Sequence, residues 1–102
     1  MPEVADALVG LGEVALRRGD AAEAVPRFER AVQIRRLRAG TRGHKLGAAL
    51  FGLARALQDS PSGRGRDVSR ARTLAQEAAE ALRAAGVAQQ DELAAVEAWL
   101  KR

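Results

Sequence analysis

The stretch LGEVALRRGDAAEAVPRF, residues 11–28, contains two helical patterns with a break between them. Apolar side chains recur at helical spacing on both sides of the break, which consists of Arg-Arg-Gly-Asp. Gly19 suits the left-handed conformation that ends many helices, and Asp20 suits the first position of the next helix, where its carboxylate accepts free N–H groups. We therefore predict two helices joined by a tight turn.

The same arrangement returns later in the chain with constant offsets. Four positions of the first helix recur 42 residues later: Leu8, Leu11, Gly12 and Ala15 as Leu50, Leu53, Ala54 and Leu57. Four positions of the second helix recur 47 residues later: Asp20, Ala24, Phe28 and Ala31 as Asp67, Ala71, Ala75 and Ala78. The difference of five residues falls in DSPSGRGR, residues 59–66, a predicted flexible loop where an insertion costs little.

The composition favours an all-α protein. Aromatic residues make up 3% of the 102 residues, and alanine, leucine, glutamate and arginine are abundant. The spacing predicts helices over about 2–18, 20–39, 44–58, 67–85 and 89–100. The inward stripe of the first helix is expected to hold Val4, Leu8, Leu11 and Ala15, and that of the second to reach Ile34 or Leu37.

These residues resemble the motif of the tetratricopeptide repeat, a helix pair with Leu-Gly in its first helix and Ala, Phe and Ala in its second. Leu11, Gly12, Ala24, Phe28 and Ala31 match that motif, whereas Ala54 and Ala75 replace the glycine and phenylalanine in the second copy. The resemblance implies a right-handed α-solenoid of two antiparallel helix pairs. We expect one domain over residues 1–102, with repeats at about 3–39 and 43–84 and a capping helix at about 89–101.

A period of about 42 residues resembles the longer subtype of the family, which is found in kinesin light chains. Two segments, LVGLGEVALRRGDAAEAVPRFERAV and DELAAVEAWL, also resemble the C-terminal repeats of serine/threonine kinases from myxobacteria. This closer resemblance implies a regulatory or scaffolding role in bacterial signalling, with catalysis carried out elsewhere.

Repeat packing explains the small residues in the motif. Two helices approach closely only where side chains are small, and Phe28 is expected to fill the groove between pairs. One pair cannot bury both of its faces, so the next pair must cover it. The residues assigned to this packing are Leu8, Leu11, Gly12, Ala24, Phe28, Ala31, Leu50, Leu53, Ala71, Ala75 and Ala78.

The sequence offers little for catalysis. It contains no cysteine, which excludes disulfides and thiolate sites and fits a reducing, cytoplasmic compartment. Its one histidine, His44, has no acidic residue near it in the chain, and the kinase motifs are missing. We predict a protein that is not an enzyme and that uses neither a cofactor nor a metal. No apolar run is long enough to span a membrane.

The family resemblance implies that the first helix of each pair lines a concave groove where a protein or peptide docks. The candidate groove residues are Val9, Glu13, Leu16, Arg17, Phe51, Arg55 and Gln58. Phe51 is either an anchor for the partner or a packing residue against a neighbouring helix. Trp99 either seals the capping helix or marks a contact with another chain.

Charge suggests further interpretations. Residues 35–72 hold ten basic side chains and two acidic ones, whereas the rest of the chain holds seven and eleven. The Arg-rich middle could bind nucleic acid or another anionic surface, although few aromatic residues are present to stack on bases. The charges could equally support self-association, and two repeats suggest a homodimer. A last alternative is a structural or dimerisation segment of a larger kinase-type protein.

Overall fold

A computed structural model describes residues 2–39, 43–61, 66–86 and 90–101. These form five α-helices: α1 (Pro2–Arg17), α2 (Ala21–Ala39), α3 (His44–Asp59), α4 (Val68–Ala85) and α5 (Gln90–Leu100). The described residues contain no strand, so the predicted all-α class is confirmed. Much of the predicted loop over 59–66 and the first residue of the predicted capping helix lie outside the described residues.

The helix boundaries follow from local signals. Gly19, Gly43 and Gly86 have φ angles of 79°, 107° and 99°, a region that glycine enters without the steric cost of a Cβ atom. The Asp67 carboxylate accepts a hydrogen bond of 2.9 Å from the backbone N–H of Arg70, which satisfies one free donor of α4. These residues place the turns where the sequence predicts them.

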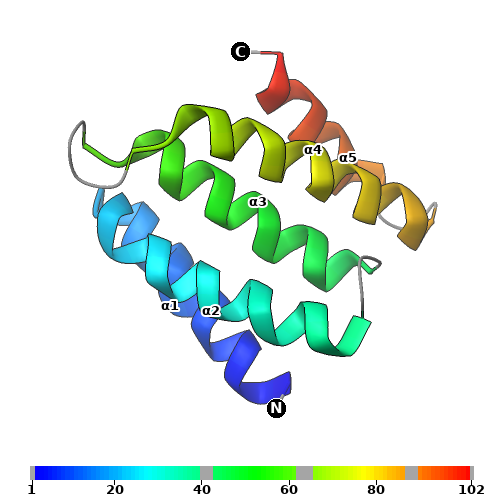
Figure 1. Ribbon diagram of the computed structural model, residues 1–102, viewed down its shortest axis with the longest axis horizontal. Helices are drawn as coiled ribbons and strands as arrows, with labels where there is room; N and C mark the ends of the chain where they lie inside the picture. The colour runs from blue at the N-terminus through cyan, green and yellow to red at the C-terminus, as the bar shows by residue number, and fades with distance from the viewer. Residues whose placement is uncertain (1, 40–42, 62–65, 87–89, 102) are drawn as a thin grey trace.

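The helices stack in chain order as antiparallel neighbours (Figure 1). α2 packs between α1 and α3, and α4 packs between α3 and α5, while α1 also contacts α3 directly. The first helix of the first pair begins at Pro2, and the first helix of the second pair begins 42 residues later, at His44. The second helices begin 47 residues apart, at Ala21 and Val68. The arrangement is that of a tetratricopeptide-like helical repeat. α5 follows the two helix pairs and takes the place that the first helix of a third pair would have.

Phe28 occupies the centre of the first interface between pairs. Its side chain is fully buried, and its ring lies between Gly12 of α1 and Gly52 of α3. A Cβ atom at Gly12 would come within 2.6 Å of ring carbon Cε2, and one at Gly52 would also overlap the ring. The ring therefore brings α1 and α3 close together, because each helix has a glycine where it meets the ring.

A second contact of the same kind lies on the other side of α3. A Cβ atom at Gly47 would come within 2.8 Å of Leu82 Cγ, so the close approach of α4 depends on this glycine. The remaining packing residues predicted from the sequence are also placed. Leu8 is half-buried, and the buried ones are Gly12, Ala24, Phe28, Ala31, Leu50, Leu53, Ala71, Ala75 and Ala78.

The predicted inward stripe of the first helix is wrong at two positions, since Val4 is 38% exposed and Leu11 49%. Leu37, the open end of the second stripe, is 88% exposed and does not belong to it. The buried face of α1 is instead carried by Ala5, Gly12 and Ala15, with Leu8 half-buried. α1 is the first helix of the stack and makes its main contacts with α2 and α3, which leaves Val4 and Leu11 exposed.

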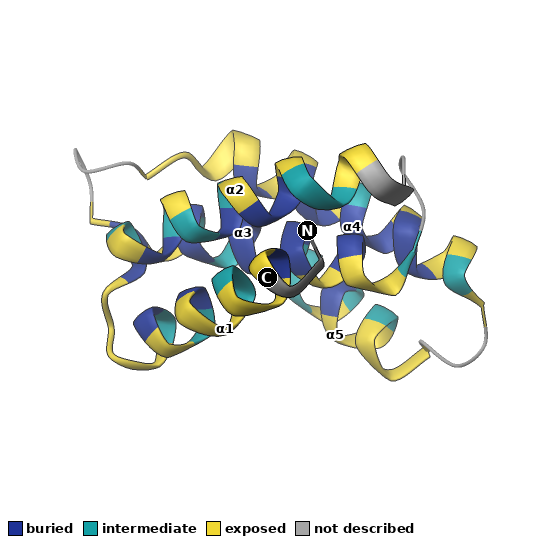
Figure 2. Cartoon of the chain, turned by 90° about the horizontal axis from the view of Figure 1, so that it is seen from below, coloured by how far each residue is buried: buried dark blue, intermediate teal, exposed yellow. Residues whose placement is uncertain are grey.

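Burial divides the molecule into a buried interior and exposed outer surfaces (Figure 2). The buried surfaces of α2, α3 and α4 face one another, whereas α1 and α5 lie on the same side of the stack with exposed outer surfaces. None of the described helices combines the length and the apolar character needed to cross a bilayer.

Candidate functional site

A groove opens between α1 and α5, with α3 as its floor. Its volume is about 160 Å³, too small for most organic ligands but suited to individual side chains of a bound segment. The lining is mostly apolar, and carboxylates stand at its edges. The residues that line it are Glu13, Gly47, Ala48, Phe51, Arg55, Leu82, Glu92, Ala95 and Val96.

A chain of side-chain contacts runs across this groove and links three helices. The guanidinium of Arg55 on α3 donates a hydrogen bond of 2.6 Å to Glu13 Oε1 on α1. The same guanidinium lies 4.9 Å from the centre of the Phe51 ring, a cation–π distance. Phe51 in turn meets Trp99 of α5 edge-on, with ring centroids 6.0 Å apart and an angle of 88° between the planes. We call these four residues the groove cluster.

The groove cluster is held in place by the repeat itself. Glu13 and Arg55 are 42 residues apart, so they occupy the same position in successive first helices. Each keeps about 30% of its side-chain surface exposed, which leaves the ion pair partly desolvated but reachable from the groove. Because each member touches the next, the cluster forms a connected surface.

The structure brings together three of the predicted groove residues, Glu13, Phe51 and Arg55. Val9 and Leu16 are half-buried and pack against the core, while Arg17 is exposed and is not part of the lining. Gln58 lies at another hollow, of about 280 Å³, which it shares with Val68, Arg72 and Trp99.

Both interpretations of Phe51 find support in its surroundings. Its edge-on contact with Trp99 is the packing role, and Trp99 thereby fixes α5 against α3. Phe51 is nevertheless only half-buried, and its remaining surface lines the groove, as an anchor residue would require.

The α5 side of the groove was not predicted from the sequence. Glu92, Ala95 and Val96 line it together with Gly47 and Leu82. The sequence holds a signal for these α5 residues, since a helix over residues 90–100 that serves as the first helix of a third pair would have its groove-facing side chains on the concave face. The prediction of this helix as a cap gave it no role in the groove.

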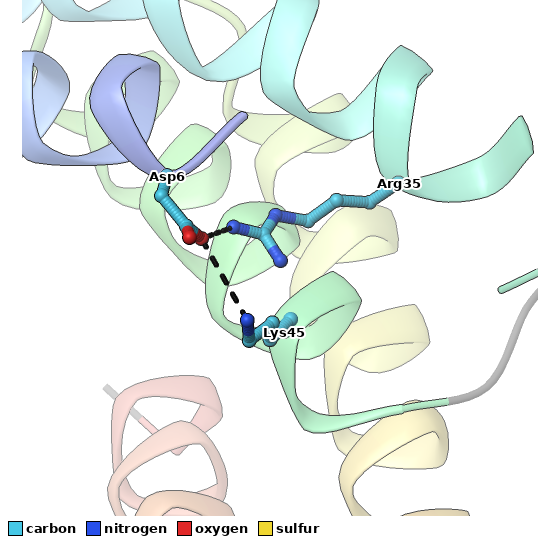
Figure 3. Close-up of polar contacts among 3 residues, drawn as sticks. All are labelled: Asp6, Arg35 and Lys45. Atoms are coloured by element: carbon cyan, nitrogen blue, oxygen red, sulfur yellow. Dashed lines mark hydrogen bonds and ion pairs between the residues drawn. The ribbon is translucent and has the colours of Figure 1, made fainter. Parts of the chain in front are cut away.

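Five of the ten basic residues of the Arg-rich middle form ion pairs within the described part of the chain. Asp6 on α1 forms ion pairs with Arg35 of α2 and, at 3.9 Å, with Lys45 of α3 (Figure 3). Between the second helices, Arg36 meets Glu77 at 2.8 Å, and Arg70 meets Glu29 at 3.3 Å. Arg38, Arg42 and Arg64 have side chains outside the described part of the structure. The uneven charge of the sequence therefore serves contacts between helices.

The pKa of Asp6 is shifted by these contacts. The hydrogen bond from Arg35 holds the pKa of the Asp6 carboxyl below its ordinary value, and the positive charge of Lys45 acts in the same direction. Lost hydration raises the pKa; this effect is smaller than that of the Arg35 hydrogen bond and larger than that of the Lys45 charge. Since the Arg35 side chain is only 11% exposed, Asp6 is the acceptor that neutralises a mostly buried cation.

Within the described residues no group of three or more histidine, cysteine, aspartate or glutamate side chains could hold a metal ion. His44 is exposed at the first position of α3.

Known proteins provide a comparison for this chain. A family model described as tetratricopeptide repeat matches residues 3–60, more than half of the chain. The matched region begins in α1 and ends just after α3, so it includes both helices that contact the Phe28 ring. Searches of curated proteins and of solved structures find no match.

Proposed function

The chain belongs to the tetratricopeptide repeat family, whose domains are generally non-catalytic modules for protein–protein interaction, and we propose that it binds a peptide or helix of a partner protein in the groove between α1 and α5. The observation that carries the proposal is the groove cluster: its members Glu13, Phe51 and Arg55 line the groove, and Trp99 holds Phe51 from α5.

The lining indicates what such a partner carries. An apolar side chain would bury against Ala48, Phe51 and Val96, and its burial supplies the main favourable free energy. A neighbouring lysine or arginine would meet Glu13 or Glu92 at the edge of the groove. A segment with an acidic C-terminus is disfavoured for the same reason, and the chain contains no asparagine to hold a terminal carboxylate.

We also propose the finer assignments that the sequence suggests. The 42-residue offset between α1 and α3 supports the longer repeat subtype, and two repeats followed by α5 as a cap support the domain organisation. The absence of cysteine supports a cytoplasmic location, and the likeness to kinase-linked repeats supports a role in bacterial signalling. The reading frame around the gene would test that role by showing whether a kinase or other effector is attached.

A blocking substitution tests the groove. Ala48 is exposed on α3 and lines the groove, so Ala48→Arg fills it without entering the core. Ala84→Arg makes the same change at an exposed position of α4 outside the groove. Peptides selected from a random library on the wild-type chain are then measured against both variants by isothermal titration calorimetry.

We expect Ala48→Arg to weaken the selected peptides by about tenfold or more, and Ala84→Arg to leave their affinity unchanged. Selected peptides that bind Ala48→Arg as tightly as the wild type contradict the proposal. Retention on heparin that falls steeply with salt, combined with no peptide binding, favours the nucleic-acid alternative.

A further inference from the structure

A second hollow lies beyond the groove, and the proposed function does not use it. Its volume is about 280 Å³. Pockets for small organic ligands begin at roughly 300 Å³, so the hollow suits a single large side chain better than a whole organic molecule. Three helices contribute to it: it is lined by Gln58 near the end of α3, Val68 and Arg72 in the first turns of α4, and Trp99 near the end of α5.

The hollow continues the groove along α3. Phe51, Arg55 and Gln58 are spaced by four and three residues, so they lie along one face of that helix. The first two line the groove, and Gln58 lines the hollow. Phe51 contacts Trp99, which lines the hollow, so these two rings form the boundary between the two spaces. At about 1.5 Å per residue, Phe51 and Gln58 are about 10 Å apart along the helix axis.

The two spaces differ in the charge that they offer to a ligand. The groove has Glu13 and Glu92 at its edges, and its Arg55 is already paired with Glu13. Among the described residues that line the hollow, Arg72 is the one charged side chain, and it is exposed. Arg72 forms no ion pair with any described residue. A negative group is therefore repelled at the groove edges and attracted in the hollow.

The side chains of the hollow suit a carboxylate carried on a short apolar stem. A guanidinium such as that of Arg72 donates two parallel hydrogen bonds to the two oxygens of a carboxylate. The side-chain amide of Gln58 supplies a further donor from the opposite helix. Val68 and the ring of Trp99 offer apolar surface to the methylene groups of an aspartate or glutamate side chain.

We propose that the hollow binds an acidic side chain of the same segment that occupies the groove, with Arg72 pairing with its carboxylate; this inference rests on the proposed function. The acidic residue lies about 10 Å from the apolar residue that packs against Phe51, which is about three residues of an extended segment or two turns of a helix. Glu92 is seven residues before Trp99 on α5, so a basic residue beside Glu92 marks the other end of the segment. The two charges fix the direction in which the segment lies.

Charge reversal at Arg72 tests the proposal. Arg72→Glu places a negative charge in the hollow, and Arg30→Glu makes the same change at an exposed position of α2 that lines neither space. Like Arg72, Arg30 forms no ion pair with a described residue, so neither variant breaks one. Random peptide libraries are selected on the wild type and on both variants. We expect acidic residues to be enriched on the wild type and on Arg30→Glu, and not on Arg72→Glu.

Calorimetry measures the contact itself. A selected peptide is compared with a version in which its acidic residue is replaced by the matching amide. On the wild type and on Arg30→Glu, the amide version should bind about fivefold or more weakly. On Arg72→Glu, it should bind as tightly as the acidic peptide or more tightly. An equal loss on Arg72→Glu and on the wild type overturns the proposal.

Ala48→Arg separates this inference from the proposed function. Peptides that lose affinity for Ala48→Arg but bind Arg72→Glu as they bind the wild type leave the groove in place and overturn the role of the hollow. Peptides that are indifferent to Ala48→Arg overturn both. Free glutamate that alters the fluorescence of Trp99, the one tryptophan of the chain, at micromolar concentration would make the hollow a small-ligand site and also overturns the proposal.

Discussion

The ring of Phe28 lies against Gly12 so closely that a Cβ atom at residue 12 would come within 2.6 Å of ring carbon Cε2. Gly52 approaches the same ring from α3. One aromatic side chain of α2 therefore sets the distance between two successive first helices. The groove depends on the distance between α1 and α3, since Glu13 of α1 and Arg55 of α3 both line the groove and form a hydrogen bond between these helices.

Removing the Phe28 ring should destabilise the fold strongly. Phe28→Ala leaves a cavity between two glycines that offer no side chains to fill it, so we expect a loss of about 3–5 kcal/mol in the free energy of unfolding. Urea unfolding followed by circular dichroism measures this loss. Leu37→Ala, at 88% exposure, should change the value by about 0.5 kcal/mol or less. A small effect of Phe28→Ala would mean that the ring is not the centre of the core.

Two glycines of α1 should respond to alanine in opposite directions. A Cβ atom at Gly10 would meet no other atom within 4 Å. Gly10→Ala should therefore stabilise the protein by about 0.5–1 kcal/mol through helix propensity. Gly12→Ala gains the same propensity but drives a methyl group into the Phe28 ring, and overpacking costs about 1–3 kcal/mol. Thermal unfolding of both variants tests this prediction. Stabilisation by Gly12→Ala would disprove the close approach of Gly12 to the Phe28 ring.

Much of the fold could be predicted from the sequence. The Arg-Arg-Gly-Asp break and the two constant offsets predicted the helix pairs, and the place of Phe28 followed from the repeat. The exposure of Val4 and Leu11 could not be predicted, because helical spacing reports that a face is apolar and not what covers it. The pairing of Arg35 with Asp6 likewise joins residues that only the tertiary fold brings together.

The ion pair between Glu13 and Arg55 should couple α1 to α3 measurably. A double-mutant cycle with Glu13→Gln and Arg55→Met isolates their interaction from the other contacts of each residue. For a pair with about 30% of each side chain exposed, we expect a coupling of about 0.5–1 kcal/mol that declines with added salt. The cycle is measured by urea unfolding at low and high ionic strength, and a coupling near zero at low salt would show that this ion pair does not hold the two helices together.

The Asp6 contact should make stability depend on pH. Because the folded pKa of Asp6 lies below its ordinary value of 3.8, its contribution to stability is complete above that value. The contribution is lost as the pH falls through the lowered folded pKa. Asp6→Asn should therefore unfold at lower urea than the wild type at about pH 7, and the difference should shrink as the pH falls below 3.8.

A control separates this contact from general surface charge. Glu80→Gln removes one carboxylate from an exposed position of α4. We expect its difference from the wild type at neutral pH to be smaller than that of Asp6→Asn, since only the latter removes the negative charge that pairs with Arg35. A difference for Asp6→Asn that persists unchanged at low pH would show that it does not arise from the Asp6 charge.

The most direct test of the central claim is a nuclear magnetic resonance titration of the labelled chain with a library-selected peptide. The groove account predicts that the largest backbone shifts fall on α1, α3 and α5 at Glu13, Ala48, Phe51, Glu92 and Ala95, and that Ala48→Arg abolishes them. Shifts confined to the outer surfaces of α2 and α4, or shifts that survive Ala48→Arg, would contradict it.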